Sequence, residues 1–454
     1  MSLHYLDWLI MGGYFVALVR IGFFRSGSIK ENQNEFILSG RRLSLPGFIA
    51  TLVTTWYGAI LGIGENTYLH GIQTWFIFAL PYYVFAAIYA VWVANQVRQQ
   101  KQFSIPDHFR KSYGKTTGII SAVLILFLSS PAPYILSMGV LLQFIFGIKL
   151  GWALIISTVY SVAYVYNGGF RAVVRTDYFQ FILMFLGFGF LFIFLWRSAV
   201  SPFELFRGLP AIHTQPLGGH SLQYVLVWFF IALWTIVDPG FFQRCAAAES
   251  PEIARKGILI SIGFWFVFDC LTIITGLYAF ILVIPESPIM SFPVMAAEVL
   301  PPILLGLFLV GIFATIMSTI DSFCLINAIT LGRDILWRIQ ASKTKRYPTP
   351  FIKEGLVITA FLSIVLAFSL PSVVMLFYTL GSILIPGLIL PFLFALNRKK
   401  VSEDLANLWV VLPVLVSFIW VLVSKINDTI LWNIEPFYPG MAVSIFLSIF
   451  IIKK

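Results

Sequence analysis

Residues 311–334 read GIFATIMSTIDSFCLINAITLGRD and follow the apolar run LLGLFLV at 304–310. The apolar residues predict a helix that crosses a membrane. Hydroxyl side chains recur in this helix at the spacing that places them on one face, and the carboxylate of Asp321 lies beside them. The hydroxyl residues are Thr315, Ser318, Thr319 and Ser322.

Hydroxyls and a carboxylate at membrane depth indicate a buried site for an alkali cation. A carboxylate inside a bilayer costs roughly 2.5–3.5 kcal/mol, so Asp321 needs a compensating partner. Hydroxyl and carboxylate oxygens are the ligands that hard cations prefer. Two other interpretations stay open: the hydroxyls could hydrogen-bond carbonyls one turn earlier, and Asp321 could cap a kink.

The composition places the chain among polytopic membrane proteins. Of its 454 residues, 59% are hydrophobic and 11% are charged, whereas a soluble domain has about 25% charged residues. The mean hydropathy is +0.90. The net charge of +10 comes from basic residues between apolar runs, which is typical of topology signals and not of nucleic-acid binding. The lipid bilayer is therefore an expected partner, and neither nucleic acid nor a protein partner is expected.

Thirteen apolar segments approach or exceed the length of about 20 residues that crosses a bilayer. Backbone polar groups in lipid must pair within their own segment, so we expect all of these segments to be helices. The predicted fold is an all-α polytopic membrane protein with a single domain over residues 1–454. The segments are 5–24, 46–66, 72–96, 117–146, 150–167, 176–196, 222–241, 257–284, 301–330, 354–370, 373–396, 405–424 and 437–452. The segments 150–167, 354–370 and 437–452 are short, so their full crossing is left open.

The distribution of Lys and Arg predicts the orientation. With thirteen spans and an external N-terminus, 25 of the 30 Lys and Arg residues fall in the cytoplasmic loops and C-terminal tail, and four fall in the outer loops. Basic residues concentrate on the cytoplasmic side of membrane proteins. We therefore expect a multi-pass protein of the plasma membrane, the inner membrane in a bacterium, with a cytoplasmic C-terminus.

Two of the predicted spans contain helix-breaking residues. The span 46–66 includes four glycines and a proline, and the span 222–241 ends in Asp238-Pro239-Gly240. Unwound backbone at membrane depth is tolerated where it lines a cavity or packs on protein. A broken helix in each half of the chain indicates a transporter with inverted repeats and a midplane substrate site. The alternative is that Gly is simply common in membrane helices.

Four motifs resemble those of the sodium:solute symporter family. Residues 168–180 (GGFRAVVRTDYFQ) are similar to its GGxxAVxxTDxxQ signature, and residues 314–322 (ATIMSTIDS) to its AAxMSTxxS segment. Residues 238–248 (DPGFFQRCAAA) resemble its DQxxxQRxLAA segment, and residues 104–114 (SIPDHFRKSYG) its TxPExLxxRYG loop. The motifs occur in the family's order, so the resemblance covers at least residues 40–335. The family includes sodium-coupled carriers of sugars, proline, pantothenate and sialic acid.

The resemblance implies a secondary active transporter that couples sodium to a small organic solute by alternating access, with sodium as the coupling ion. It also implies a LeuT-type core of five plus five helices in inverted repeats, over about residues 46–196 and 222–396. The alternatives are a proton-coupled symporter and a transporter fold used as a sensor. An enzyme is not expected, because the chain has no HExxH, GxSxG or Cys/His constellation. A channel would need rings of ligands from several copies.

The resemblance also implies two cation sites. Matched residue by residue, the first sodium site has the hydroxyls of Ser318 and Thr319 and the carbonyls of Thr315, Thr54 and Tyr57. Trp56 and Ala59 are the competing carbonyl assignment, because the segment at 54–62 is slightly shorter than the family pattern. Some family members have a second site, and its ligands match Asp177, Ser318, Asp321 and Ser322. An aspartate at 321, in place of a hydroxyl residue, should strengthen cation binding or permit protonation.

The expected substrate contacts lie near the two helix breaks and are Trp56, Tyr57, Glu65, Asn66, Trp234 and Asp238. Each aromatic side chain could instead serve packing or a membrane-interface belt, and Glu65 could lie at the outer mouth in water. The charges at membrane depth are mostly acidic and include Asp269, whereas Arg20 is the one basic residue in mid-span. This balance disfavours a substrate with several negative charges, which a guanidinium would recognise.

Overall fold

The computed structural model describes residues 3–24, 32–340, 347–369 and 372–452. Some of the Lys and Arg residues behind the predicted orientation lie outside the described residues, namely those at 25–31, 341–346 and 453–454. Position 370, the end of the predicted span 354–370, also lies outside them. Helices make up 84% of the described residues, which contain no strand beyond one bridge between Leu43 and Ala248. The prediction of an all-α fold is therefore confirmed.

In the described part of the chain, ten helical segments are long and apolar enough to cross a membrane. Seven of them begin with or consist of a long helix: α1 (Tyr5–Phe24), α11 (Leu150–Ser198), α17 (Pro251–Leu282), α19 (Leu304–Ala328), α21 (Pro348–Ser369), α22 (Val373–Leu396) and α23 (Glu403–Ile426). The other three are composite. The first consists of α5 (Gln73–Phe78), α6 (Leu80–Ile88), the π-helix η2 (Tyr89–Val93) and α7 (Ala94–Gln100). The second consists of α9 (Lys115–Leu128) and α10 (Ala132–Phe146), and the third of α14 (Leu222–Ile231), α15 (Trp234–Val237) and α16 (Pro239–Ala247).

Shorter helices complete the molecule. Three of them are apolar: α3 (Leu45–Thr54), α4 (Ile60–His70) and α24 (Phe437–Ile452). Helix α19 continues through the π-helix η4 (Ile329–Trp337) into α20 (Arg338–Gln340). The others are α2 (Gln33–Leu38), η1 (Ser39–Arg41), α8 (Ile105–Tyr113), α12 (Pro202–Gly208), α13 (Ala211–Thr214), η3 (Pro288–Met290), α18 (Ser291–Val299) and η5 (Leu431–Asn433). The predicted spans 373–396 and 437–452 match α22 and α24, whereas the total of thirteen crossings stays a prediction.

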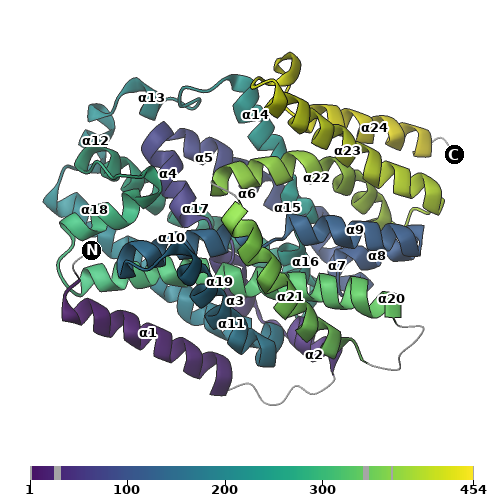
Figure 1. Cartoon of the computed structure of the whole chain (residues 1–454), viewed down its shortest axis with the longest axis horizontal. Helices are drawn as coiled ribbons and strands as arrows, with labels where there is room; N and C mark the ends of the chain where they lie inside the picture. Colours follow the sequence, from purple (N-terminus) through teal and green to yellow (C-terminus); the bar gives the residue numbers. More distant parts are fainter. Residues whose placement is uncertain (1–2, 25–31, 341–346, 370–371, 453–454) are drawn as a thin grey trace.

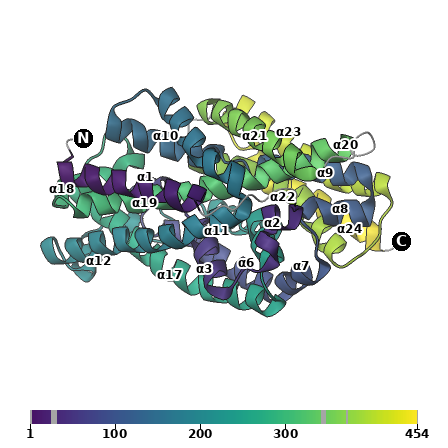
Figure 2. The same cartoon turned by 90° about the horizontal axis from the view of Figure 1, so that it is seen from below.

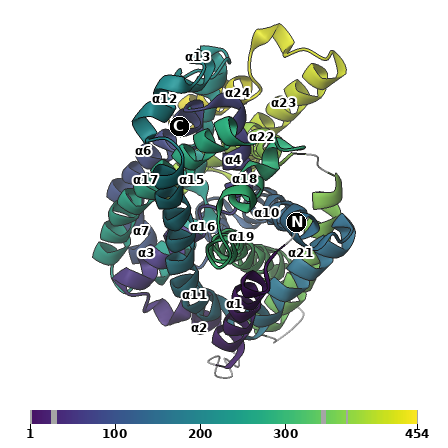
Figure 3. The same ribbon diagram turned by 90° about the vertical axis from the view of Figure 1, so that its left-hand side faces the viewer.

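The centre of the bundle is α19. All of its 25 residues except Leu304 and Leu307 are buried. Figure 3 shows α19 in the interior, with α1, α11, α16 and α21 around it, and Figure 2 shows α1 running beside α19 and α11. At the edge of the molecule, α23 and α24 pack against each other and against α22 (Figure 1). The hydroxyl-rich segment that opens the sequence analysis therefore has protein, and not lipid, on every side.

One residue turns α11 into a helical hairpin. Gly169 has φ 55° and ψ −150° inside an otherwise helical run. Tyr160, before it, donates a hydrogen bond to the carbonyl of Phe15 (2.6 Å), and Gln180, after it, donates one to the hydroxyl of Tyr14 (3.3 Å). Because both arms reach neighbouring residues of α1, the chain reverses at Gly169. The arms correspond to the predicted spans 150–167 and 176–196.

We predict that Gly169→Ala destabilises the protein in detergent. A Cβ atom at Gly169 would lie 2.5 Å from the carbonyl oxygen of Phe36, and the backbone conformation costs a non-glycine residue about 1–3 kcal/mol. The thermal unfolding midpoint should therefore fall. The matched control is Gly189→Ala in the same helix, where a Cβ would meet nothing within 4 Å. Equal midpoints for the two variants would show that the turn tolerates a side chain.

Candidate functional site

Two helices are interrupted at the centre of the molecule. Residues 55–59 are not helical and separate α3 from α4. Asp238 has an extended backbone between α15 and α16, and its Oδ1 accepts the amide N–H of Phe241 at 2.8 Å. Both breaks fall where the sequence predicts them. At the first, a Cβ on Gly58 would lie 2.5 Å from the Thr319 side chain, so glycine allows the unwound segment to approach α19.

Oxygen atoms from α19 and the first break converge. The hydroxyl of Thr319 lies 3.1 Å from the carbonyl oxygen of Thr55 and 3.2 Å from that of Thr315. Ser318, one residue earlier, donates to Asp177 Oδ1 at 2.6 Å. Carbonyl and hydroxyl oxygens at such spacing are a ligand set that suits an alkali cation.

The side chains of the other two predicted carbonyl ligands bond elsewhere. The hydroxyl of Thr54 donates back to the carbonyl of Ala50 (2.8 Å), and that of Tyr57 to the carbonyl of Trp265 (3.1 Å). The carbonyl of Tyr57 accepts the amide N–H of Ile60 at 3.0 Å. The residue whose carbonyl meets Thr319 is Thr55, which the sequence analysis missed. Its signal was its position directly after the last helical residue, because carbonyls at a helix end lack partners within the helix.

The residues of the predicted second cation site surround an arginine. Asp177 accepts hydrogen bonds from Thr51 as well as Ser318. The guanidinium of Arg244 donates to the hydroxyls of Thr51 (3.0 Å), Thr55 (2.9 Å) and Ser322 (2.7 Å). The sequence analysis counted Arg244 as a loop residue, but it lies in α16 and is fully buried.

Asp321 lies at the side of this cluster and faces α11. Both of its oxygens accept hydrogen bonds, one from Ser161 and one from Tyr164. The charged side chain that interacts electrostatically with Asp321 is another carboxylate, that of Asp177. In the described part of the chain, Asp321 forms no ion pair with Lys or Arg.

A cavity of about 100 Å³ lies between the two breaks. Four of the predicted substrate residues line it: Trp56, Tyr57, Trp234 and Asp238. Asp269 also lines it, together with aromatic side chains that the sequence analysis missed, namely Phe78, Tyr82, Tyr134, Phe323 and Phe377.

Two predicted substrate residues lie elsewhere. Asn66 donates to the hydroxyl of Thr74 (2.9 Å), and neither it nor Glu65 lines the cavity. Among the missed residues, Tyr134 had a signal, because it directly follows Pro131-Ala132-Pro133, where the chain passes from the break after α9 into α10.

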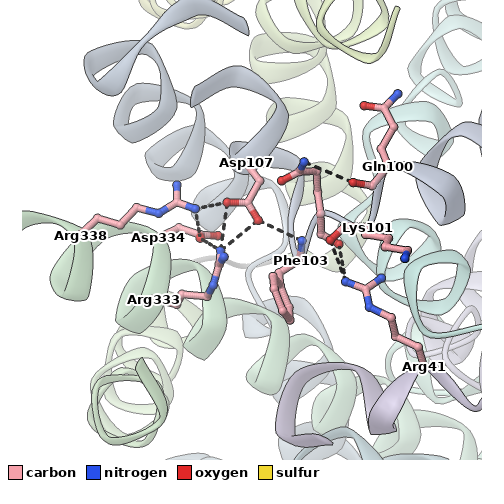
Figure 4. Close-up of polar contacts among 9 residues, drawn as sticks. Arg41, Gln100, Lys101, Phe103, Asp107, Arg333, Asp334 and Arg338 are labelled. Carbon is pink, nitrogen blue, oxygen red and sulfur yellow. Dashed lines mark hydrogen bonds and ion pairs between the residues drawn. The ribbon is translucent and has the colours of Figure 1, made fainter. Parts of the chain in front are cut away.

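A second polar cluster joins residues from loops and helix ends (Figure 4). Asp107 pairs with Arg333 (3.2 Å) and with Arg338, and Asp334 pairs with both arginines (2.5 and 3.2 Å). Arg41 donates to the carbonyl of Lys101 at 2.8 Å. The sequence analysis used these basic residues only as topology signals, since ion pairs between distant segments leave no local pattern.

Two interrupted helices that meet at a buried cavity in a membrane-spanning bundle define a secondary active transporter. The model of the sodium:solute symporter family matches residues 36–409. The match covers most of the chain, which therefore belongs to the sodium:solute symporter family. The protein is a sodium-coupled symporter of a small organic solute, integral to the plasma membrane, and not an enzyme. The resemblance seen in the four motifs is confirmed.

The relatives cover nearly the whole chain. Sodium/proline symporter 2 of Staphylococcus saprophyticus is 23% identical, over 97% of this chain and 91% of the relative. The sodium/proline symporter of Staphylococcus aureus (strain JH9) is 22% identical, over 98% of this chain and 92% of the relative.

Solved structures share the fold. A Na⁺-coupled sialic acid symporter in a substrate-bound outward-open state has a TM-score of 0.80 at 16% identity, with 99% of this chain and 97% of that chain covered. Mhp1, a nucleobase-cation-symport-1 family transporter, has a TM-score of 0.62 at 14% identity, with 93% and 95% covered. The prediction of a LeuT-type fold is confirmed.

We predict that the Asp107 carboxylate stabilises the protein above pH 4 and loses its effect in acid. Burial raises the pKa of the Asp107 carboxyl, but Arg333 and Arg338 lower it more, so the pKa falls from 3.8 to about 2. A lowered folded-state pKa stabilises the protein above the unfolded pKa, and this stabilisation is lost as the pH falls through about 2. The contribution at neutral pH is about 2 kcal/mol.

The measurement is the thermal unfolding midpoint in detergent between pH 2 and pH 7. Asp107→Asn should lower the midpoint at pH 7 and flatten the acid part of the curve. Asp428→Asn, at an exposed position, is the control and should follow the wild type. Parallel curves for Asp107→Asn and the wild type would contradict the assignment.

Proposed function

We propose that the solute binds in the cavity between the two helix breaks and that a sodium ion binds beside it. The proposed sodium ligands are the hydroxyls of Thr319 and Ser318 and the carbonyls of Thr315 and Thr55. The convergence of Thr319 on the Thr55 carbonyl at 3.1 Å carries the proposal. Thr55 also lines the cavity, so the ion would hold the unwound segment in the conformation that meets the solute.

We further propose a second cation at Asp177, Ser318, Asp321 and Ser322. Arg244 supplies positive charge beside Asp177, through the hydroxyl of Thr51. Asp321 has hydroxyl partners but no Lys or Arg partner in the described part of the chain. A buried carboxylate is costly without compensation, which supports a bound cation, or a proton, at Asp321.

The proposed solute contacts are Trp56, Tyr57, Trp234 and Asp238. Relatives at 22–23% identity transport proline with sodium, which supports a small solute. Gly62 of α4 and Val374 of α22 also line the cavity, and Val374 lies at the end of α22 that the predicted orientation places outside. We propose that orientation, with the N-terminus outside and the C-terminus in the cytoplasm, for a single domain with repeats over about 46–196 and 222–396. We propose neither a nucleic-acid nor a protein partner.

The sodium site is tested by removing its two hydroxyls. Ser318→Ala and Thr319→Ala each remove one oxygen ligand, so sodium affinity should fall by about 1–3 kcal/mol for each. The measurement is the sodium dependence of solute uptake into proteoliposomes, or of thermal stability if uptake is lost. Thr330→Ala, which removes a hydroxyl that only bonds Ile326 one turn earlier, is the matched control. Wild-type sodium dependence in the double variant would contradict the proposed sodium site.

The second cation is tested by the stoichiometry of transport. One monovalent ion crossing 100 mV releases about 2.3 kcal/mol, so at fixed sodium and solute gradients the number of coupled ions sets the reversal potential. We predict two coupled cations for the wild type and one for Asp321→Asn, measured as reversal potentials in proteoliposomes. If Asp321 only braces α11 through Ser161 and Tyr164, the variant loses rate or stability with an unchanged ratio. A reversal potential that depends on pH would identify the second ion as a proton.

A further inference from the structure

The cavity between the helix breaks has aromatic and acidic walls. Of its fifteen described lining residues, eight are aromatic and two are the carboxylates of Asp238 and Asp269, and none is Lys, Arg or His. The ring of Trp56 lies 5.1 Å from that of Tyr82, at 70°. The ring of Tyr134 lies 5.3 Å from that of Phe323 and 5.7 Å from that of Phe377. Aromatic side chains from several helices therefore line the space.

The charges around the cavity do not balance. The positive charge of Arg244 interacts electrostatically with the carboxylates of Asp177 and Asp238. Its guanidinium bonds hydroxyls behind the first break and does not line the cavity. Asp269 accepts a hydrogen bond from the hydroxyl of Tyr83 and is buried. Arg244 thus compensates two of the three carboxylates, whereas Asp269, which lines the cavity, has a tyrosine partner and no ion pair with a described Lys or Arg.

We propose that the solute is a small organic cation whose nitrogen is methylated, such as a quaternary ammonium compound; this rests on the proposed solute site. The negative faces of aromatic rings attract a positive charge, and aromatic cages favour alkylated ammonium groups. The two carboxylates add attraction that burial strengthens, since a low dielectric reduces screening. The methyl groups contact the rings, and the positive nitrogen offsets the excess negative charge.

Other solute classes fit these walls less well. A carboxylate on the solute would lie near Asp238 and Asp269 with no basic side chain among the described lining residues to receive it. A sugar needs many hydrogen-bonding groups, whereas most of this lining is aromatic or aliphatic. The aromatic and acidic walls together therefore select for charge and for methyl groups.

The decisive comparison uses two ligands of the same shape. Choline carries a trimethylammonium group, and its uncharged carbon analogue carries a tert-butyl group in the same place. With sodium present, purified wild-type protein should bind choline at least about tenfold more tightly than the analogue, by tryptophan fluorescence or thermal shift. Equal or weaker binding of choline overturns the proposal.

Variants then locate the charge effect. Asp238→Asn and Asp269→Asn should each weaken choline binding by about tenfold and leave binding of the uncharged analogue nearly unchanged. Asp428→Asn, at an exposed position, should change neither. If the cavity variants fail to fold, the comparison of the two ligands on the wild type still decides the question.

Proteoliposome uptake separates this inference from the proposed function. Sodium-driven uptake of proline without binding of choline overturns the cation inference and leaves the proposed sodium-coupled site intact. Choline binding that is insensitive to sodium supports the cation inference and counts against the proposed coupling site. Protein that responds to sodium but binds neither choline nor proline overturns the cation inference.

Discussion

A guanidinium without access to water joins the two broken helices of this symporter to their neighbours. Arg244 comes from α16, directly after the second break, and it bonds hydroxyls of α3 and α19. Phe170 of α11 lies 5.2 Å from its guanidinium carbon. A buried charge is costly unless it is hydrogen-bonded, so these hydroxyls, and Asp177 beyond Thr51, are fixed relative to one another. The positions of the two helix breaks, the hydroxyl face of α19 and the carboxylate of Asp177 thus depend on one another.

Thr55 stands where three parts of the machinery meet. Its hydroxyl accepts from Arg244, its carbonyl faces Thr319, and its side chain borders the cavity. These contacts are possible because the backbone is unwound at 55–59 and Gly58 allows close approach to α19. An ion bound at the Thr55 carbonyl would therefore restrict the same segment that the solute touches, which is a physical basis for coupling without a long pathway.

A second polar cluster, at the end of the bundle, also holds buried charged side chains in contact with several segments. Arg333 lies within reach of Asp107 and Asp334 and 4.9 Å from the ring of Phe103. Arg41, which also faces Phe103, donates to the carbonyl of Ala246 at 2.9 Å. The cluster thereby joins the loop around α8, the end of α19 and the end of α16. Movement of either broken helix must rearrange or carry along these contacts, so this end of the bundle moves as a unit or opens by breaking ion pairs.

The sequence by itself determined the helical class, the hydroxyl face of α19 and the two helix breaks. Each of these follows from local properties: hydrophobic length, a 3.6-residue period, and the backbone limits of Gly and Pro. Only the tertiary structure decided that Asp321 faces Ser161 and Tyr164, that Arg244 is buried, and that Thr55 supplies the carbonyl beside Thr319. A helical period fixes which residues share a face, but the rotation and packing of separate helices decide which partners that face meets.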